Sequence, residues 1–248
     1  MLATLNINNQ QQTIDLSKPL DISIELTDTS ENPLAWYMEK PVISPVTLDD
    51  WVGKVSEGAS VNFNTILFNP HAHGTHTEGV GHISKEFYSV QKALNTFFFT
   101  AEVISVTPED FGGDLVISSI QVKKLLKGKK PEAVVIRTLP NTTQKTSKKY
   151  SHTNWPYVHE DAANYLRESG VKHLLIDLPS VDKEKDNGEL LAHKAFWNFP
   201  ENPRLDATIT EFIYVPNTIK DGKYLLNLQT ANFVNDATPS RPVLYEIL

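Results

Sequence analysis

FFFTAEVISV, residues 97–106, is the stretch that decides the fold, because a mostly apolar run of this kind is typical of a strand buried on both faces. A second such run, AVVIRTL, follows at residues 133–139. Between them, apolar residues at helical spacing predict a helix over 118–126, and Gly128 is suited to end it. A strand, a helix and a second strand in this order predict an α/β chain.

The rest of the chain adds strands on both sides of this unit. EDAANYLRESG, residues 160–170, predicts a short amphipathic helix with Gly170 at its end. Further strands are predicted at residues 20–27, 173–182, 208–215 and 223–233. The polar stretch 140–157 is expected to form a long loop. We therefore expect a mixed α+β fold in which one domain, residues 1–248, is built on a mixed sheet with packed helices.

The composition excludes several classes of protein. The 23 basic and 30 acidic residues give a net charge of -7, which argues against a partner that binds through a phosphate backbone. With no cysteine, the chain has neither disulfides nor a thiol nucleophile. The polar first 22 residues do not resemble a signal peptide, and no apolar run reaches 18 residues. We expect a cytoplasmic protein that acts on a small molecule, without nucleic acid or membrane as a partner.

Four of the eight histidines lie within NPHAHGTHTEGVGHI, residues 69–83. The preceding SVNFNTILFNP, residues 60–70, is expected to be a strand that leads into this stretch. On an extended chain His76 and Glu78 would share a face, and so would His71 and His73. Imidazole and carboxylate groups are natural ligands of zinc, manganese or iron. Ordinary loop histidines are the alternative, but this density of them favours a metal site.

More distant residues could complete such a site. His193 and Glu211 each lie in an ordered apolar segment, and Asp177 and Asp182 lie at the end of a predicted strand. Carboxylates at such positions often bind ligands or cap the next turn. Taken alone, each of these residues is more often structural than functional.

HGTHTEGVGH, residues 73–82, resembles the signature H-x-G-T-H-x-D-x-P-x-H of the cyclase-like metal-dependent hydrolases, a family that includes bacterial kynurenine formamidase. The likeness extends in the family's order over most of residues 20–211, through LDISIELT, AVVIRT and GVKHLLIDLPSVD followed by LLAH. The combination is more specific than any single motif. The resemblance implies the swivelling β/β/α-like fold of that family.

The resemblance also implies roles for individual residues. His76 matches a ligand of the first metal, and Glu78 stands where the family has a bridging aspartate. His82 matches the histidine that donates and accepts the proton. His193 matches a late ligand of the second metal, and Glu211 resembles the glutamate that contacts both ions.

The chain departs from the signature at three positions. Ala72 stands where the first histidine is expected, with His71 and His73 on either side, so a one-residue backbone insertion must bring one of them into place. We favour His71, which follows a proline, and His73 remains the alternative. Glu78 is one methylene longer than aspartate, and Val80 replaces a proline, which loosens the following turn.

By resemblance, the activity is hydrolysis of an amide through water activated by a metal. Arylformamides such as N-formylkynurenine, an intermediate of tryptophan catabolism, and cyclic amides are the implied substrates. Trp36 falls near the family's substrate-contacting tryptophan, although it could equally be a core aromatic residue. The implied cofactor is a divalent metal, zinc before manganese, with one or two ions per subunit. Family members self-associate, so a homo-oligomer, dimer or tetramer, is expected.

Other readings of the sequence remain open. No G-x-S-x-G motif occurs, so a serine hydrolase with a nucleophile elbow is not indicated. A non-catalytic protein that binds metal or a small ligand on the same fold is the main alternative. A structural metal is another, and it predicts a closed four-ligand site whose loss unfolds the protein.

Overall fold

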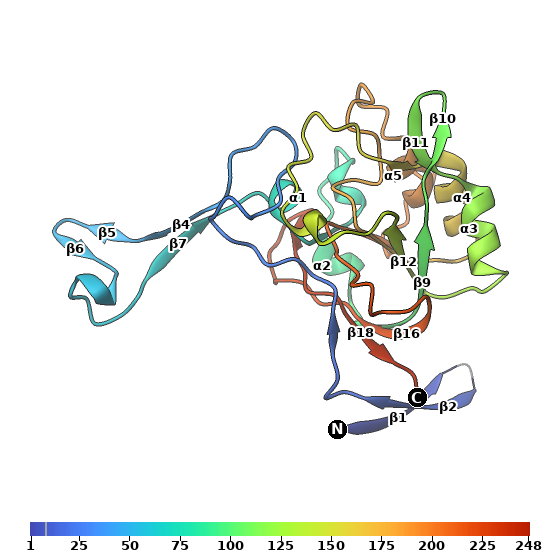
Figure 1. The fold of residues 1–248 in the computed structure, drawn as a ribbon, viewed down its shortest axis with the longest axis horizontal. Helices are drawn as coiled ribbons and strands as arrows, with labels where there is room; N and C mark the ends of the chain where they lie inside the picture. Colours follow the sequence, from blue (N-terminus) through green and yellow to red (C-terminus); the bar gives the residue numbers. More distant parts are fainter. Residues whose placement is uncertain (8) are drawn as a thin grey trace.

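A nine-stranded mixed sheet forms the centre of the protein, in the order β17-β8-β15-β14-β12-β9-β16-β18-β3 (Figure 1). The computed structural model describes residues 1–7 and 9–248. The strands of this sheet are β3 (Leu20–Asp21), β8 (His76–Glu78), β9 (Phe98–Val106), β12 (Ala133–Thr138), β14 (His173–Ile176), β15 (Thr208–Glu211), β16 (Gly222–Asn227), β17 (Ala237–Pro239) and β18 (Val243–Glu246). The four strands β9, β12, β14 and β15 are parallel, and antiparallel strands flank them on both sides. The expected mixed α+β fold is confirmed.

The central strands owe their position to apolar side chains on both faces. Every residue of β12 is buried, and Val135 lies between Val103 of β9 and Leu175 of β14 in the ladder. Because successive side chains of a strand point to opposite faces, Val134 and Val135 belong to two different apolar clusters. The strands predicted from residues 97–106 and 133–139 are thus confirmed as the middle of the sheet.

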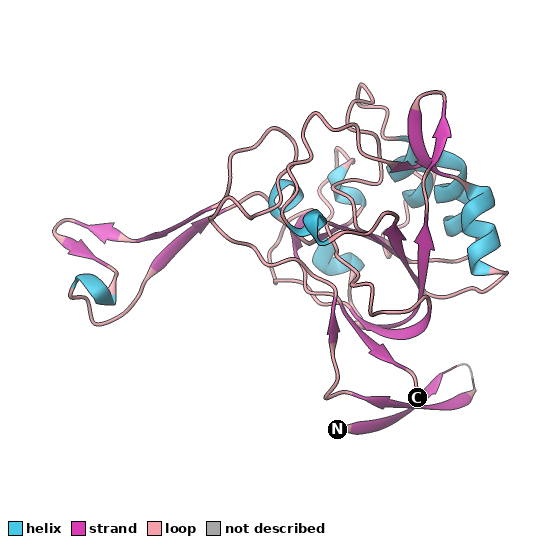
Figure 2. Cartoon of the chain, in the orientation of Figure 1, coloured by secondary structure: helices cyan, strands magenta, loops and turns pink. Residues whose placement is uncertain are grey.

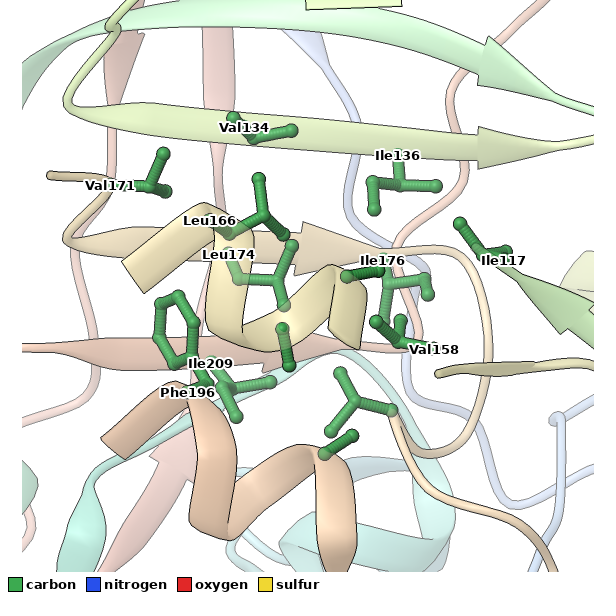
Figure 3. Packing of buried hydrophobic residues seen from close by; sticks show 14 of the residues in the cluster. Ile117, Val134, Ile136, Val158, Leu166, Val171, Leu174, Ile176, Phe196 and Ile209 are labelled. Carbon is green, nitrogen blue, oxygen red and sulfur yellow. The ribbon is translucent and has the colours of Figure 1, made fainter. Parts of the chain in front are cut away.

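Helices α3 (Ser119–Leu126), α4 (Glu160–Glu168) and α5 (Leu191–Trp197) cover one face of the sheet, and mainly irregular segments cover the other (Figure 2). Two shorter helices are α1 (Pro70–His73) and α2 (Val90–Ala93). Leu166 of α4 and Phe196 of α5 pack on Val134, Leu174 and Ile209 of the strands (Figure 3). Burying side chains of this kind stabilises by about 1.5 to 3 kcal/mol each, so this interface anchors the helices.

The sequence signals at the helix ends act as expected. Ser118 accepts a hydrogen bond from the Gln121 amide, and the Gln121 side chain accepts one from the Ser118 amide, forming a capping box. Lys127 and Gly128 then take left-handed conformations, with φ of 51° and 77°. Gly170, with φ of 87°, follows α4 in the same way.

Smaller elements complete the structure. They are β1 (Leu2–Ile7), β2 (Gln10–Asp15), β4 (Val42–Pro45), β5 (Thr47–Leu48), β6 (Trp51–Val52), β7 (Asn64–Leu67), β10 (Glu109–Phe111), β11 (Asp114–Ile117) and β13 (Tyr157–Val158), with the 3-10 helices η1 (Val55–Glu57), η2 (Val80–His82) and η3 (Thr143–Thr146). The ribbon of β4 and β7 extends far from the body, and β1 pairs with β2 in a separate hairpin (Figure 1). Among the described residues, no helix is long and apolar enough to cross a membrane.

Five expected strands are shorter than their patterns. The strands expected at residues 173–182, 208–215 and 223–233 end at Ile176, Glu211 and Asn227. The other two are the segments 20–27 and 60–70. Of residues 20–27 only Leu20–Asp21 pair in the sheet, because the Asp21 carboxylate accepts hydrogen bonds from the Ser23 amide and hydroxyl and turns the chain. Of residues 60–70 only Asn64–Leu67 form a strand, and this strand lies in the projecting ribbon. The residue types of segments 20–27 and 60–70 predicted an extended backbone. They did not predict which strand each segment would pair with.

Candidate metal centre

Strand β8 organises the cluster of histidines and carboxylates. It lies between β15 and β17, and the antiparallel register places Glu211 directly opposite His76. On the other side Ala237, the first residue of β17, pairs with Glu78, so Asp236 arrives next to the same strand. Strand β8 thus carries Glu78 itself and brings the carboxylates of Glu211 and Asp236, from two distant segments, next to it.

The turn of helix α1 decides which early histidine enters the cluster. Asn69 caps this turn by accepting a hydrogen bond from the His71 amide, with Pro70 at the first helical position. The expected extended chain, with His71 and His73 on one face, is wrong, since residues two apart on a helix point in different directions. His71 points toward Glu78, with 3.2 Å between Nδ1 and Oε2. His73 instead accepts from the Asn69 amide and bonds the Glu39 carbonyl through Nε2.

Glu78 lies at the centre of the cluster and is fully buried. Its Oε2 is 3.7 Å from His82 Nδ1 and 4.0 Å from His76 Nε2, in addition to its approach to His71. Its Oε1 is 2.9 Å from His193 Nε2. Four imidazoles thus surround a single carboxylate that water cannot reach.

Glu211 lies on the far side of the same histidines. Its Oε2 is 3.3 Å from His76 Nε2, and its Oε1 is 3.7 Å from His193 Nε2. The Val181 amide donates to Oε1 at 2.8 Å, which fixes the side chain. Phe212, the next residue, has a φ of 55°, so strand β15 ends where its glutamate meets the cluster.

Two of the histidines are oriented through their second ring nitrogen. His76 Nδ1 is 3.0 Å from the Gly74 carbonyl oxygen, so its Nε2 points toward Glu211. His193 lies on helix α5, and its Nδ1 is 2.5 Å from Asp182 Oδ2. Partners of this kind fix the ring and the tautomer of a histidine that binds metal. Asp182, at the end of a predicted strand, thus supports the cluster from behind.

Asp236 is a member of the cluster that the sequence did not indicate. Its Oδ2 is 3.4 Å from His71 Nε2 and 3.4 Å from His82 Nδ1. The two imidazole rings stack, with 4.3 Å between their centroids. In the sequence Asn235 and Asp236 look like an ordinary polar pair before a short strand. The pairing of β17 with β8 is what places Asp236 at the histidine cluster. No sequence signal could have distinguished this aspartate from others.

Charged neighbours shift the pKa values of several side chains in the cluster. Burial disfavours a charged His71, but the carboxylates of Asp236 and Glu78 outweigh burial and raise its pKa to about 10. Burial acts in the same way on His193, whose pKa nevertheless lies well above the usual range because of Asp182 and Glu78. Burial would raise the pKa of Glu78, whereas His82 and the other histidines lower it well below the usual range. The carboxylates therefore favour positive charge among the imidazoles.

The donor atoms fit a divalent cation. Within residues 1–7 and 9–248, the buried atoms His76 Nε2 and Glu78 Oε2 have no hydrogen-bond partner, which is costly unless another group satisfies them. The described part of the chain contains three overlapping groups whose ligand atoms lie within 4.8 Å of one another: His71–His76–Glu78, Glu78–His82–His193 and His71–His82–Asp236. Nitrogen and carboxylate oxygen suit zinc, manganese or iron.

Trp36 has a strained backbone conformation, with φ of 59°. Its ring meets Trp155 edge to face, with 5.0 Å between centroids. It packs against a buried aromatic group that includes Phe212, whose ring is 6.3 Å from that of His76. The preceding residue, Ala35, donates its amide to the Ala72 carbonyl oxygen of α1. Trp36 is thus half-buried near the histidines, and contact with a substrate stays a prediction.

Asp177 lies outside the histidine cluster and has a structural role. It accepts hydrogen bonds from the amide and hydroxyl of Thr138 and pairs with Lys145 at 2.7 Å. Burial raises the pKa of its carboxyl group, against the opposing effect of the lysine. Of the two aspartates singled out in the same stretch, Asp182 alone contacts the histidine cluster.

Comparisons with known proteins find one family and a set of similar structures. The Cyclase family model, described as "Putative cyclase", matches residues 14–183. A crystal structure of an isatin hydrolase bound to thioisatinate has a TM-score of 0.67 and 15% identity, over 93% of each chain. A potential metal-dependent hydrolase with cyclase activity has a TM-score of 0.66 and 17% identity, over 92% of this chain and 98% of its own. Isatin hydrolase A from Labrenzia aggregata has a TM-score of 0.66 and 12% identity, over 92% and 93%. No curated protein matches the sequence. At these identities the structures share the fold.

Proposed function

Because the chain belongs to the Cyclase family, whose model matches residues 14–183, we propose that it is a metal-dependent hydrolase that cleaves an amide C–N bond in a small molecule. The observation that carries this proposal is the pair of unsatisfied buried atoms, His76 Nε2 and Glu78 Oε2, inside a cluster of histidines. The expected single domain over residues 1–248 remains part of the proposal.

Five side chains would hold the metal: His71, His76, Glu78, His193 and Glu211. Zinc is proposed before manganese, with one or two ions per subunit. When bound, such an ion lowers the pKa of a water ligand and polarises a carbonyl oxygen. The residues support this by burial and by the outer contacts that fix their rings, since a preorganised site does not reorganise during reaction.

His82 is proposed to move the proton. Its side chain is 29% exposed, whereas that of Glu78 is fully buried, so His82 can meet both water and a substrate. In the reaction the oxygen of water bonds to the carbonyl carbon, and the C–N bond breaks. His82 takes a proton from the water and delivers one to the leaving nitrogen, giving a carboxylic acid and an amine. Asp236, 3.4 Å from His82 Nδ1, would keep the ring in position.

The proposed substrate is an aromatic amide, either an arylformamide such as N-formylkynurenine or a cyclic amide. The isatin hydrolases that share the fold support a cyclic amide, because isatin hydrolysis is what their names describe. Trp36 offers an aromatic ring in the group that includes Phe212, which approaches His76, and offset or edge-to-face packing with an aromatic substrate is favourable.

The test is hydrolysis by the zinc-loaded and manganese-loaded protein of a panel of formanilides, N-formylkynurenine, isatin and lactams. His82→Ala should lower kcat/KM by about 10² to 10⁴ with its metal content unchanged. The control is His159→Ala, because His159 caps helix α4 and lies outside the three ligand groups. Unchanged hydrolysis by His82→Ala with metal bound would contradict the proton-transfer role. Tight binding of a panel member without turnover by the wild type would favour the non-catalytic alternative.

A further inference from the structure

Glu184 is a buried carboxylate that the proposed reaction does not use. Its Oε1 accepts hydrogen bonds from the Tyr37 hydroxyl at 2.8 Å and from the His152 amide. Its Oε2 accepts one from the Asn154 amide at 2.8 Å. Burial alone would raise the pKa of Glu184, but the amides of His152 and Asn154 outweigh burial and lower this pKa. One ionised carboxylate thus joins two segments that are distant in the sequence.

The backbone on both sides of this contact is strained. Trp36 and Tyr37 have φ of 59° and 60°, and His152 and Asn154 have φ of 66° and 46°. This left-handed region is uncommon for residues other than glycine and is unfavourable for bulky ones. Such conformations persist only where the surroundings hold them, and they gather at functional sites. Glu184 supplies such a hold, because each of its three hydrogen bonds comes from one of the strained residues.

The two joined segments are residues 34–38, here called the tryptophan segment, and residues 140–157, here called the long loop. Main-chain hydrogen bonds connect them further along. The Leu34 amide donates to the Lys148 carbonyl oxygen, and the Tyr150 amide donates to the Leu34 carbonyl oxygen. The tryptophan segment therefore lies along the long loop, and the carboxylate contact closes one end of this pairing.

An aromatic group connects the tryptophan segment with the metal centre. The Trp36 ring meets the Trp155 ring edge to face, and the Trp155 indole donates to the Asp182 carbonyl oxygen at 3.0 Å. Phe212 belongs to the same aromatic group, and its ring is 6.3 Å from that of His76. The position of Trp36 relative to the metal ligands thus depends on how its segment is held against the long loop.

We propose that Glu184 is a positioning residue for the proposed hydrolysis, because it fixes the tryptophan segment on the long loop and so sets the aromatic wall for an aromatic amide. This role rests on the proposed function, since a wall for the substrate matters only if a substrate is turned over. Within residues 1–7 and 9–248, Glu184 belongs to none of the three ligand groups, so it acts through its neighbours. A wall that is fixed in advance lowers the cost of binding.

The first test is the kinetics of Glu184→Ala with the aromatic amide, among the formanilides, N-formylkynurenine, isatin and lactams, that the wild type hydrolyses. Displacement of the wall should raise KM about three- to tenfold, the range expected of one aromatic contact, whereas kcat and zinc affinity should stay within about twofold. Glu189→Ala, which removes an exposed carboxylate of the same segment, is the control and should match the wild type. An unchanged KM, or a zinc affinity that falls as much as KM rises, would overturn the proposal.

Conservative variants separate this contact from a general loosening of the fold. Glu184→Gln keeps an oxygen for Tyr37 and His152 but turns an amide nitrogen toward the Asn154 amide, so its KM should lie between those of the wild type and Glu184→Ala. Tyr37→Phe removes only the hydroxyl and should also raise KM, and it tests the same contact if Glu184→Ala does not fold. In the Glu184→Ala background the tyrosine change should have no further effect. Additive effects would mean that the two groups act independently and would overturn the positioning role.

Amide hydrogen exchange tests the positioning without a substrate. In Glu184→Ala, exchange in the tryptophan segment and in residues 150–154 should become at least about tenfold faster, while exchange in strand β12 stays the same. Equal exchange in the wild type and the variant would overturn the positioning role whatever the activity. Absence of turnover by the wild type would overturn the proposed function, whereas turnover with a KM that Glu184→Ala leaves unchanged would overturn this inference alone.

Discussion

Removal of the charge behind His193 tests whether the outer contacts determine metal affinity. In Asp182→Asn the amide oxygen can still accept from the Ala192 amide, which donates to Oδ1 at 2.7 Å in the wild type. The amide nitrogen then faces His193 Nδ1, where a carboxylate oxygen lies at 2.5 Å. If Nε2 is to bind metal, Nδ1 bears the proton, so two donors would face each other.

The expected loss of metal affinity follows from the lost orientation of the His193 ring. Replacement of the outer partner of a metal-binding histidine typically weakens metal binding by about 10- to 100-fold. This corresponds to about 1.4 to 2.7 kcal/mol of binding free energy. The substitution removes the two hydrogen bonds that Asp182 Oδ2 accepts, from His193 Nδ1 and from the His193 amide, together with one countercharge. All five proposed ligands stay in place, so metal binding should be weakened and not abolished.

The assay is a zinc titration in competition with a chromophoric chelator at pH 7.5. Asp177→Asn is the matched control, because Asp177 is equally buried on the same stretch and contacts Thr138 and Lys145. Breaking that buried pair should lower the free energy of unfolding by about 3 kcal/mol. Zinc affinity should stay within about threefold. Wild-type affinity in folded Asp182→Asn, or an equal loss in both variants, would refute the reasoning.

Two further predictions concern stability. Burial, with a smaller effect of a neighbouring lysine, lowers the pKa of His173 to about 3. The folded state therefore excludes a proton that the unfolded state binds below pH ~6.5, so stability present at neutral pH is lost as the pH falls. Between pH 7 and 4 the urea-derived unfolding free energy should fall by about 3 kcal/mol more for the wild type than for His173→Gln, and parallel curves would contradict this. A Cβ at Gly81 would lie 2.2 Å from a main-chain oxygen, whereas one at Gly79 meets nothing closer than 3.7 Å. Gly81→Ala should thus destabilise by about 1 to 3 kcal/mol in thermal melts and Gly79→Ala by less, and equal melting temperatures would exclude the clash.

The centre of the fold was predictable from local patterns. Continuous apolar runs at residues 97–106 and 133–139 require burial on both faces, and the structure places them side by side in the sheet. The helix after Ser118 was predictable because its cap and apolar spacing lie within one short segment. Signals of this kind depend only on neighbours in the chain.

The candidate site was predictable only in part. The density of histidines in residues 69–83 indicated a metal site, and the resemblance indicated His193 and Glu211. The structure brings both of these residues to Glu78 or its histidines. The helical turn that separates His71 from His73 did not follow from the sequence, because a single turn capped by Asn69 has too few residues to show a period.

The sequence by itself determined which segments are buried and where ligand-type side chains are dense, since both depend on residue type and short-range spacing. The tertiary structure alone decided the register of β8 between β15 and β17 and thereby the arrival of Asp236. It also decided that the ribbon of β4 and β7 stands apart from the body. Pairing of distant strands depends on the whole fold, because a one-residue slip in register would turn every side chain of β8 to the opposite face.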